Sequence, residues 1–282
     1  MTNNNIPFDL TKLAEPATQL IKAVRSALGI LYEPTRIRRM AKALVDAERT
    51  MAEGRSEIKD IESRAMRRLL TQEVRHQENI EIITKLALKS LPDKVSDNLV
   101  DQDWVHQFFD YCKDVSNEQM QSLWAKLLAG EVVKPGTFSR RTLRVVKDLD
   151  KEEAQLFTKL CTFVWQVDDE TTLWPIFLGF QEDLLRKAEL DFMDLIDLDT
   201  AGLIKHDQAG YSTIDIKEIK LSYFGRKHKL KVKGTKSHII YGDVALTVEG
   251  SMLAPISGAT PSEEYRSFIV DQLKINNFIV ED

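Results

Sequence analysis

The stretch that decides the fold runs from Asp97 to Phe157 and reads DNLVDQDWVHQFFDYCKDVSNEQMQSLWAKLLAGEVVKPGTFSRRTLRVVKDLDKEEAQLF. It holds the densest helix-forming segments of the chain, whose apolar residues recur every three or four positions. Residues that favour helix starts precede the segments, namely Asp101 or Asp103, Ser116 with Gln119, Thr137 or Ser139, and Asp150 with Glu153. The pattern predicts a central bundle of short helices over residues 97–166.

The apolar positions of these segments form the candidate core of the bundle. Between Asp97 and Phe157 they include two tryptophans and four phenylalanines, which we interpret as packing residues rather than ligand contacts. We expect the helix that begins after Asp150 to continue through Val164 and Trp165, because both extend its apolar spacing. The expected core residues are Trp104, Val105, Phe108, Phe109, Cys112, Met120, Leu123, Trp124, Leu127, Leu128, Phe138, Leu143, Val146, Leu149, Ala154, Phe157, Leu160, Cys161, Val164 and Trp165.

Ordered blocks of the sequence resemble a bacterial family known only as a domain of unknown function. The blocks are YEPTRIRRMAKA at 32–43, MQSLWAKLLAGE at 120–131 with PGTFSRRT at 135–142 and then 150–160, and LTVEGSMLAPI at 246–256. The resemblance covers nearly the whole chain and implies no reaction, because none is established for the family. The Leu-Trp-Ala-x-Leu-Leu-Ala run at 123–129 is also similar to the alpha-type abortive-infection proteins of phage defence, which implies a defence role.

Length and composition limit the possible classes of protein. The chain has 282 residues, 43% of them hydrophobic, which is enough for about two domains with real cores. Its formal net charge of -5 gives no global attraction to nucleic acid, so such binding needs a local patch. The two cysteines, Cys112 and Cys161, lie on apolar helix faces, and we expect buried free thiols in a reducing compartment.

The same sequence predicts where the protein resides. Its first residues, MTNNNIPFDL, lack the basic and then apolar pattern of a secretory signal. No stretch reaches the roughly 18 apolar residues that a membrane-spanning helix needs. We therefore expect a cytoplasmic protein that is at most peripheral at the inner face of the membrane.

The N-terminal segment, residues 1–33, contains an amphipathic pattern between residues 9 and 31. Two interpretations stay open for this predicted helix: it rests on an anionic membrane surface, or it docks on its own protein or a second subunit. We favour docking, because its alanine-rich face suits close helix packing and no tryptophan anchors the segment. The apolar positions are Leu10, Leu13, Ala17, Leu20, Val24, Leu28 and Leu31.

Residues 34–91 predict one long, coiled-coil-like helix, since they are rich in Ala, Glu, Arg, Lys and Leu and lack proline after Pro34 up to Ser90. Apolar residues recur there in uninterrupted alternating steps of three and four positions. This spacing marks a seam for self-association or for packing along the first helix. The seam contacts are Ile37, Met40, Leu44, Met51, Ile58 and Ile61, with Ala47, Gly54 and Ala65 between or after them. Beyond Ala65 the phase drifts, and we expect the helix to repack onto the body of the protein.

Residues 172–282 predict a winged-helix-like α+β domain. We expect helical spacing from Leu184 to Leu198 that ends at Gly202, followed by strands and two further helices. The expected strands are Tyr211–Ile216, Lys229–Lys233 and Ile239–Leu246, and the expected helices are a short one from Thr247 to Leu253 and a closing one from Ser262 to Asn276. The fold class is thus mainly α with a small β part: a long N-terminal helix or coiled coil, a central helical bundle and this C-terminal domain.

Two basic clusters are candidates for phosphate contact with nucleic acid or lipid. The alternatives are a solubilising charge run for the first, and for the second an edge hairpin whose lysines prevent aggregation. The candidate recognition helix, Glu189–Thr200, carries four aspartates, so sequence-specific reading of DNA is disfavoured. The clusters are Arg36, Arg38, Arg39 and Lys42 near the N-terminus, and Arg226, Lys227, Lys229, Lys231 and Lys233 in the expected wing.

No pattern in the sequence indicates catalysis or a cofactor. A glycine-rich phosphate loop is lacking, and the five histidines show no metal-ligand spacing. We therefore predict a non-enzymatic oligomeric helical scaffold or effector in anti-phage defence, associated with itself, with an unknown protein partner and in some settings with a membrane surface. The alternative is a nucleic-acid-associated adaptor that uses the basic wing.

Overall fold

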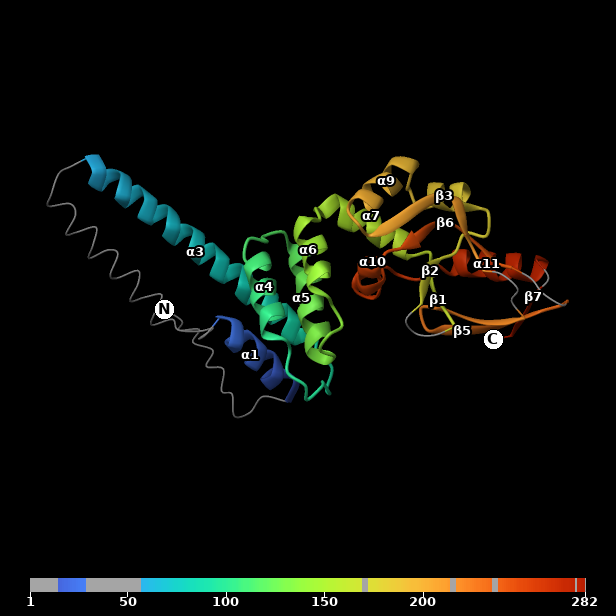
Figure 1. Cartoon of the computed structure of the whole chain (residues 1–282), viewed down its shortest axis with the longest axis horizontal. Helices are drawn as coiled ribbons and strands as arrows, with labels where there is room; N and C mark the ends of the chain where they lie inside the picture. Colours follow the sequence, from blue (N-terminus) through green and yellow to red (C-terminus); the bar gives the residue numbers. More distant parts are fainter. Residues whose placement is uncertain are drawn as a thin grey trace. The chain divides into compact units, whose positions relative to one another are not determined.

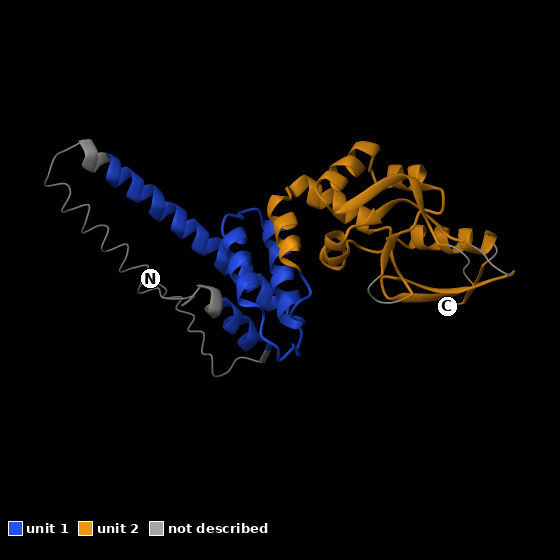
Figure 2. Cartoon of the chain, in the orientation of Figure 1, with its two compact units in different colours: residues 1–138 blue, residues 139–282 orange. Residues whose placement is uncertain are grey.

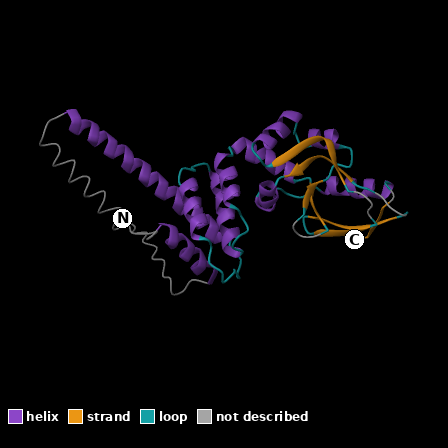
Figure 3. Cartoon of the chain, in the orientation of Figure 1, coloured by secondary structure: helices purple, strands orange, loops and turns teal. Residues whose placement is uncertain are grey.

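The computed structural model describes residues 15–28, 57–168, 172–213, 217–234, 238–276 and 278–281. They form a mainly helical protein with two small antiparallel sheets (Figures 1 and 3). The chain divides into two compact units, unit 1 (residues 1–138) and unit 2 (residues 139–282), which Figure 2 colours separately. The division falls inside the range 97–166 for which we expected one bundle, because the helices after residue 138 pack with later elements.

Unit 1 consists of four described helices: α1 (Glu15–Leu28), α3 (Glu57–Lys89), α4 (Gln102–Cys112) and α5 (Glu118–Val133). The Asp101 side chain caps α4 by accepting from the Trp104 N–H, as expected. The cap of α5 is Asn117, which accepts from Gln119 N and Met120 N, so the predicted cap Ser116 is one residue too early. The Asn79 amide donates to the Ser116 hydroxyl instead.

The core of unit 1 is aromatic. Phe108 stacks on Trp104 and meets Phe109 and Trp124 edge-on, and all four side chains are buried. Aromatic pairs of this geometry contribute beyond the area that they bury. The expected core of α4 and α5 is confirmed as packing, with Leu123 only partly buried.

The helix α1 docks on its own chain. Ala17, Leu20 and Val24, three of the apolar positions that the sequence marks, are buried, and α1 packs against α4 and α5. This face is therefore covered by protein and is not presented to a membrane surface. The remaining apolar positions of that pattern, Leu10, Leu13 and Leu31, lie outside the described residues, as does the side chain of Leu28.

The helix α3 has two unlike halves. From His76 onward it packs on α5, and Ile80, Ile83 and Ala87 are buried there. Before that point most of its apolar side chains are exposed, including Ile61 and Leu69, while Leu70 is partly buried. The expected repacking onto the body of the protein is seen only from His76 onward, because Leu69 and Val74, which follow Ala65, are still exposed.

Unit 2 begins with α6 (Arg140–Asp148) and α7 (Lys151–Cys161). Ser139 caps α6, and Asp150 with Glu153 forms the capping box of α7 that the sequence predicts. The helix α7 ends at Cys161, so the expected continuation through Val164 and Trp165 is wrong. Both residues lie in the first strand of a sheet, where alternate side chains of Val-Trp-Gln-Val are buried.

The larger sheet has five strands in the order β2-β1-β4-β5-β7, and each neighbouring pair is antiparallel. The smaller sheet pairs β3 with β6. One face of the larger sheet is covered by α11, whose Tyr265 meets Trp165 and Tyr223. The strands are β1 (Val164–Val167), β2 (Leu173–Pro175), β3 (Ile204–Ser212), β4 (Glu218–Tyr223), β5 (Arg226–Val232), β6 (Ile240–Leu246) and β7 (Phe278–Glu281).

The expected helical run from Leu184 to Leu198 is divided into two helices. Glu189 between them has a φ of 55°, and Asp191 starts the second helix by forming a capping box with Asp194. Gly202 after that helix has a φ of 77°, in agreement with the predicted helix end. The remaining helices of unit 2 are α8 (Gln181–Lys187), α9 (Phe192–Thr200), α10 (Val248–Leu253), the 3₁₀ turn η1 (Ala254–Ile256) and α11 (Glu263–Ile275).

The end of unit 2 follows the sequence closely. Thr247 caps α10 and Ser262 caps α11, and Asn276 ends α11. Under α11, the Tyr265 hydroxyl accepts from Trp165 Nε1 at 3.0 Å and donates to the Ile176 carbonyl at 2.6 Å. Burial raises the pKa of Tyr265 well above its ordinary value. This phenol is a structural anchor between the sheet and the helix that covers it.

Candidate functional site

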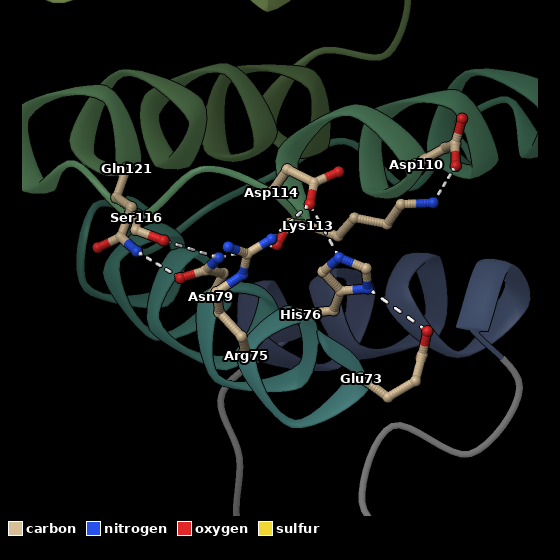
Figure 4. A network of polar contacts seen from close by, with 9 residues as sticks. All are labelled: Glu73, Arg75, His76, Asn79, Asp110, Lys113, Asp114, Ser116 and Gln121. Carbon is tan, nitrogen blue, oxygen red and sulfur yellow. Dashed lines mark hydrogen bonds and ion pairs between the residues drawn. The ribbon is translucent and has the colours of Figure 1, made fainter. Parts of the chain in front are cut away.

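A cluster of polar side chains lies where α3 meets the loop between α4 and α5 (Figure 4). On α3, Glu73, His76 and Asn79 follow one another at intervals of three residues, and Arg75 precedes Asn79 by four, so helical spacing brings them toward the side that faces the loop. We call these residues the junction network. It consists of Glu73, Arg75, His76 and Asn79 from α3, Asp110 from α4, Lys113, Asp114 and Ser116 from the loop, and Gln121 from α5.

His76 has the most enclosed ring of the junction network, with a side chain only 8% exposed. Its Nε2 lies 2.8 Å from Asp114 Oδ1, and its Nδ1 lies 3.5 Å from Glu73 Oε1. Arg75 Nη2 donates to the same oxygen of Asp114 at 3.1 Å. The imidazole is thus held between two carboxylates, and one of them binds two side chains of α3.

The buried amides of Asn79 and Gln121 form the inner part of the junction network. Asn79 Nδ2 donates to the Lys113 carbonyl at 2.8 Å, and Asn79 Oδ1 accepts from Gln121 Nε2 at 3.2 Å. Gln121 Nε2 also donates to the Val115 carbonyl at 3.0 Å. A buried amide without partners costs about 1–3 kcal/mol, so these bonds fix how α3 lies on the loop.

The remaining contacts of the junction network also hold side chains in place. Its serine hydroxyl accepts from Asn79, and Lys113 forms an ion pair with Asp110. The hydrogen bond to Asp110 raises the pKa of the Lys113 ammonium. Across the described part of the chain, no group of three His, Cys, Asp or Glu residues is placed to hold a metal ion.

The block that carries the family resemblance, LLAGE followed by PGTFS, is a locked turn. Glu131 is 1% exposed, and its carboxylate accepts from Gly136 N at 2.6 Å and from Phe138 N at 2.9 Å. Burial raises the pKa of Glu131, and the N–H groups of Phe138, Gly136 and Thr137 oppose that rise. A Cβ on Gly130 would lie 2.8 Å from the Phe138 ring. These residues therefore shape the end of α5.

The basic wing expected at residues 226–236 has a different setting in the structure. Its main part is β5, which lies between β4 and β7, so it is not an edge strand. Three of its cations have carboxylate partners: Arg226 with Glu263, Lys229 with Glu218, and Lys231 with Glu281. These carboxylates partly neutralise the three cations, so the attraction of β5 for an anionic ligand is weaker than the sequence alone indicates. Lys227 and Lys233 are exposed.

Other expected contact residues lie outside the described residues. These are the phosphate candidates Arg36, Arg38, Arg39 and Lys42, and the seam residues Ile37, Met40, Leu44 and Met51. The backbone at Ile58 belongs to α3, but its side chain is also outside the description. Among the predicted seam contacts only Ile61 is visible, and its side chain is 60% exposed.

The two cysteines are buried and free, as expected. Burial raises the pKa of Cys161 to about 12 and that of Cys112 further. Because the thiolate is the reactive form, neither thiol is suited to nucleophilic chemistry.

Sequence reasoning missed the junction network. His76, Asn79 and Gln121 are polar residues in segments where apolar periodicity was the only signal used. A polar residue at a position that continues a buried stripe, such as His76 and Asn79 before Ile80 and Ile83, is the sign that marks such a site. The loop partners have no sequence signal, because they lie more than 30 positions away in the chain.

The fold and the junction network define a class of protein. It is a mainly helical protein of two units, and in unit 1 the junction network positions α3 on the loop between α4 and α5. The chain belongs to the DUF2806 family of proteins of unknown function, whose model matches residues 63–270. The block at 32–43 lies outside that match, so the resemblance is narrower than the sequence suggests. No curated protein and no solved structure matches the chain. Within the described residues, no helix is sufficiently long and apolar to cross a bilayer.

Proposed function

We propose that the protein is a non-enzymatic, self-associating helical scaffold. The observation that carries the proposal is the row of apolar side chains left uncovered on the first half of α3. Ile61 is 60% exposed, Leu69 49% and Met66 45%, and they lie within nine residues of one helix. Ile61 and Leu69 lie eight residues, about two turns, apart on one side of the helix, and exposed apolar side chains that share a side favour burial in a partner.

The occupant of this face that we propose is a second copy of the chain. The three-and-four spacing of Ile58, Ile61 and Ala65 continues backward in the sequence to Ile37, which gives a seam of about four heptads. The charges around it are self-complementary, with acids at 57, 60 and 62 and arginines at 64, 67 and 68. Two antiparallel copies would place each acidic stretch against the basic stretch of the other.

The test is the native mass of the full chain, measured by sedimentation over a range of concentrations. Leu69→Asp puts a charge on the apolar row, and we expect at least about tenfold weaker self-association, equivalent to about 1.4 kcal/mol. Thr71→Asp is the matched control, because Thr71 is exposed on the same helix and gains the same charge. A monomeric wild-type protein, or equal effects of both substitutions, would overturn the scaffold.

Unit 2 completes the scaffold as an interaction module in this proposal. The order of α7, β2, α8, α9 and the β3–β6 pair supports a winged-helix-like arrangement, with β4 and β5 inserted between the two strands of the wing. Phe177 N donates to Tyr241 O and links the end of β2 to β6, as such an arrangement requires. The wing is then β3–β6 rather than residues 226–236. The helix in the recognition position, α9, exposes Phe192 and Met193 beside aspartates, which favours protein over DNA.

The place of this scaffold in phage defence is a proposal that rests on the similarity of residues 123–129. We expect expression of the chain in a susceptible bacterium to lower phage plaque counts, and Leu69→Asp to abolish the protection. Thr71→Asp should protect like the wild type. Plaque counts that do not change with the wild-type chain would remove the defence role and leave self-association to be judged by native mass.

A further inference from the structure

The larger sheet of unit 2 has one covered face and one open face. Trp165, Leu221, His228 and Leu230 point into the core under α11 and are buried. Because side chains alternate along a strand, the residues between them point the other way. The open face therefore presents Gln166 of β1, Glu218, Lys220 and Ser222 of β4, Lys227, Lys229 and Lys231 of β5, and Ile279 and Glu281 of β7, with Ile279 45% exposed.

The strand register brings cations and neutral donors together at one end of this face. Lys220 lies directly opposite Lys229, and Ser222 lies between Gln166 and Lys227. Like charges directly opposite each other in a sheet are destabilising. Lys229 forms an ion pair with Glu218, whereas Lys220 and Lys227 have no carboxylate within ion-pair distance among the described residues. The nearby Asp168 carboxylate accepts from the Lys220 backbone N–H.

The usual explanation for lysines in a strand does not apply here. Lysines on an edge strand prevent sheets from pairing with each other, but β4 and β5 are both interior strands of this sheet. Solubility alone would be served equally by alternating charges, as at the other end of the face, where Lys231 meets Glu281. The unpaired end is a local excess of positive charge on a chain whose net charge is -5.

We propose that this end of the open face binds the phosphodiester backbone of single-stranded nucleic acid. The ammonium groups of Lys220 and Lys227 supply the unpaired charge, Lys229 lies beside them in its ion pair with Glu218, and Ser222 and Gln166 supply neutral hydrogen-bond donors. A sheet face accommodates an extended single strand, whereas duplex reading uses an element that enters a groove. The open-face residues named above include no aromatic ring to stack on bases, so binding is sequence-tolerant and strongly salt-dependent. The face lies wholly in unit 2 and does not require self-association through α3.

The experiment measures anisotropy of fluorescein-labelled oligothymidylate and oligouridylate with the full chain between about 50 and 200 mM salt. We expect both oligonucleotides to bind, and the double substitution Lys220→Ala/Lys227→Ala to weaken binding and reduce the salt slope by about 1.4, or about 0.7 per lost contact. Both side chains are exposed, so the fold is unaffected; unchanged circular dichroism checks this.

The matched control is Lys187→Ala/Lys205→Ala, which removes the same charge from other surfaces of unit 2. We expect it to bind like the wild type. Equal losses in both double variants would show general attraction to charge and overturn the site, as would the absence of binding at the lowest salt. Vesicles containing phosphatidylglycerol form the last arm: binding to vesicles that depends on Lys220 and Lys227, without binding to either oligonucleotide, would assign the face to lipid and overturn the proposal.

Discussion

The two halves of α3 have similar sequences but opposite environments. In the second half, Ile80, Ile83 and Ala87 are buried against α5, and Ile83 is 0% exposed. In the first half, Ile61 and Leu69 have the same kind of side chain at similar spacing and stay exposed. Both stretches belong to one uninterrupted helix of 33 residues.

The difference teaches what holds such a helix in place. Helix propensity is shared by both halves, so it cannot explain why only one of them is covered. The junction network lies at the border, where His76 and Asn79 bond to the loop between α4 and α5. After that border, α5 and the loop between α4 and α5 form a platform on which α3 packs, and before it the apolar side chains of α3 are left for a partner.

The largest expected effect separates the halves directly. Ile83→Ala removes a buried side chain and should lower the free energy of unfolding of unit 1 by about 2–5 kcal/mol, from lost burial plus a cavity. Ile61→Ala, the matched control, should change it by no more than about 0.5 kcal/mol at concentrations where the chain is monomeric. Urea unfolding followed by hydrogen exchange of the α4 and α5 amides measures both. Equal losses would mean that the first half is also covered in the monomer.

The next largest effect tests the junction network at the border between the two halves of α3. Asn79→Ala leaves the Lys113 carbonyl and one bond of Gln121 without a partner in a buried place. We expect a loss of about 1–3 kcal/mol, with faster exchange of the amides in the second half of α3. Gln77→Ala, on a partly buried neighbouring position, serves as the control and should cost less. A neutral Asn79 variant would show that apolar contact alone positions α3.

A smaller effect concerns Glu131 at the end of α5, the helix on which α3 packs. Glu131→Gln keeps the volume but replaces one carboxylate oxygen with an amide NH₂, which cannot accept from Phe138 N. The loss of one buried hydrogen bond should lower stability by about 1 kcal/mol. Labelling of Cys112 by a thiol reagent near neutral pH provides the readout, because its raised pKa and burial keep the thiol inert until α4 opens. Labelling as slow as in the wild type would contradict a role for Glu131 in the platform.

The smallest expected effect is that of Asp114→Asn. Its carboxylate is 56% exposed, so the contacts with His76 and Arg75 are screened by solvent. We expect a change of less than about 1 kcal/mol that shrinks further at high salt. Unfolding measured at low and high salt checks this. A loss well above that size at low salt would mean that the charge of Asp114, and not only the buried amides, holds α3 on the loop.

Much of the local structure could be read from the sequence. The capping box at Asp150, the caps at Asp101, Thr247 and Ser262, and the helix end at Gly202 follow from side chains that bond to neighbouring backbone groups. Such bonds involve residues three or four positions apart, so the sequence contains all their information. Errors arose where two local patterns compete, as at Val164 and Trp165, whose spacing suits a helix and whose side chains suit a strand.

The candidate sites were harder to predict from the sequence than the local structure was. The pairing of β5 with β7 turns an expected edge into an interior strand, and the partner strand comes from the end of the chain. The carboxylates that neutralise Lys229 and Lys231 lie across strands, and no spacing in the sequence places Glu281 beside Lys231. His76 and Asp114 are likewise 38 positions apart.

The sequence by itself determined most helices, several of their caps, the position of the apolar stripes and the family, because the caps and stripes depend on neighbours within about one helical turn. Only the tertiary structure decided which part of a stripe is covered, which cations have carboxylate partners and which face of a sheet stays open. Those outcomes depend on residues far apart in the chain that meet only after folding. For α3, the same periodicity gives a buried half and an exposed half because α5 and the loop before it reach only one of them.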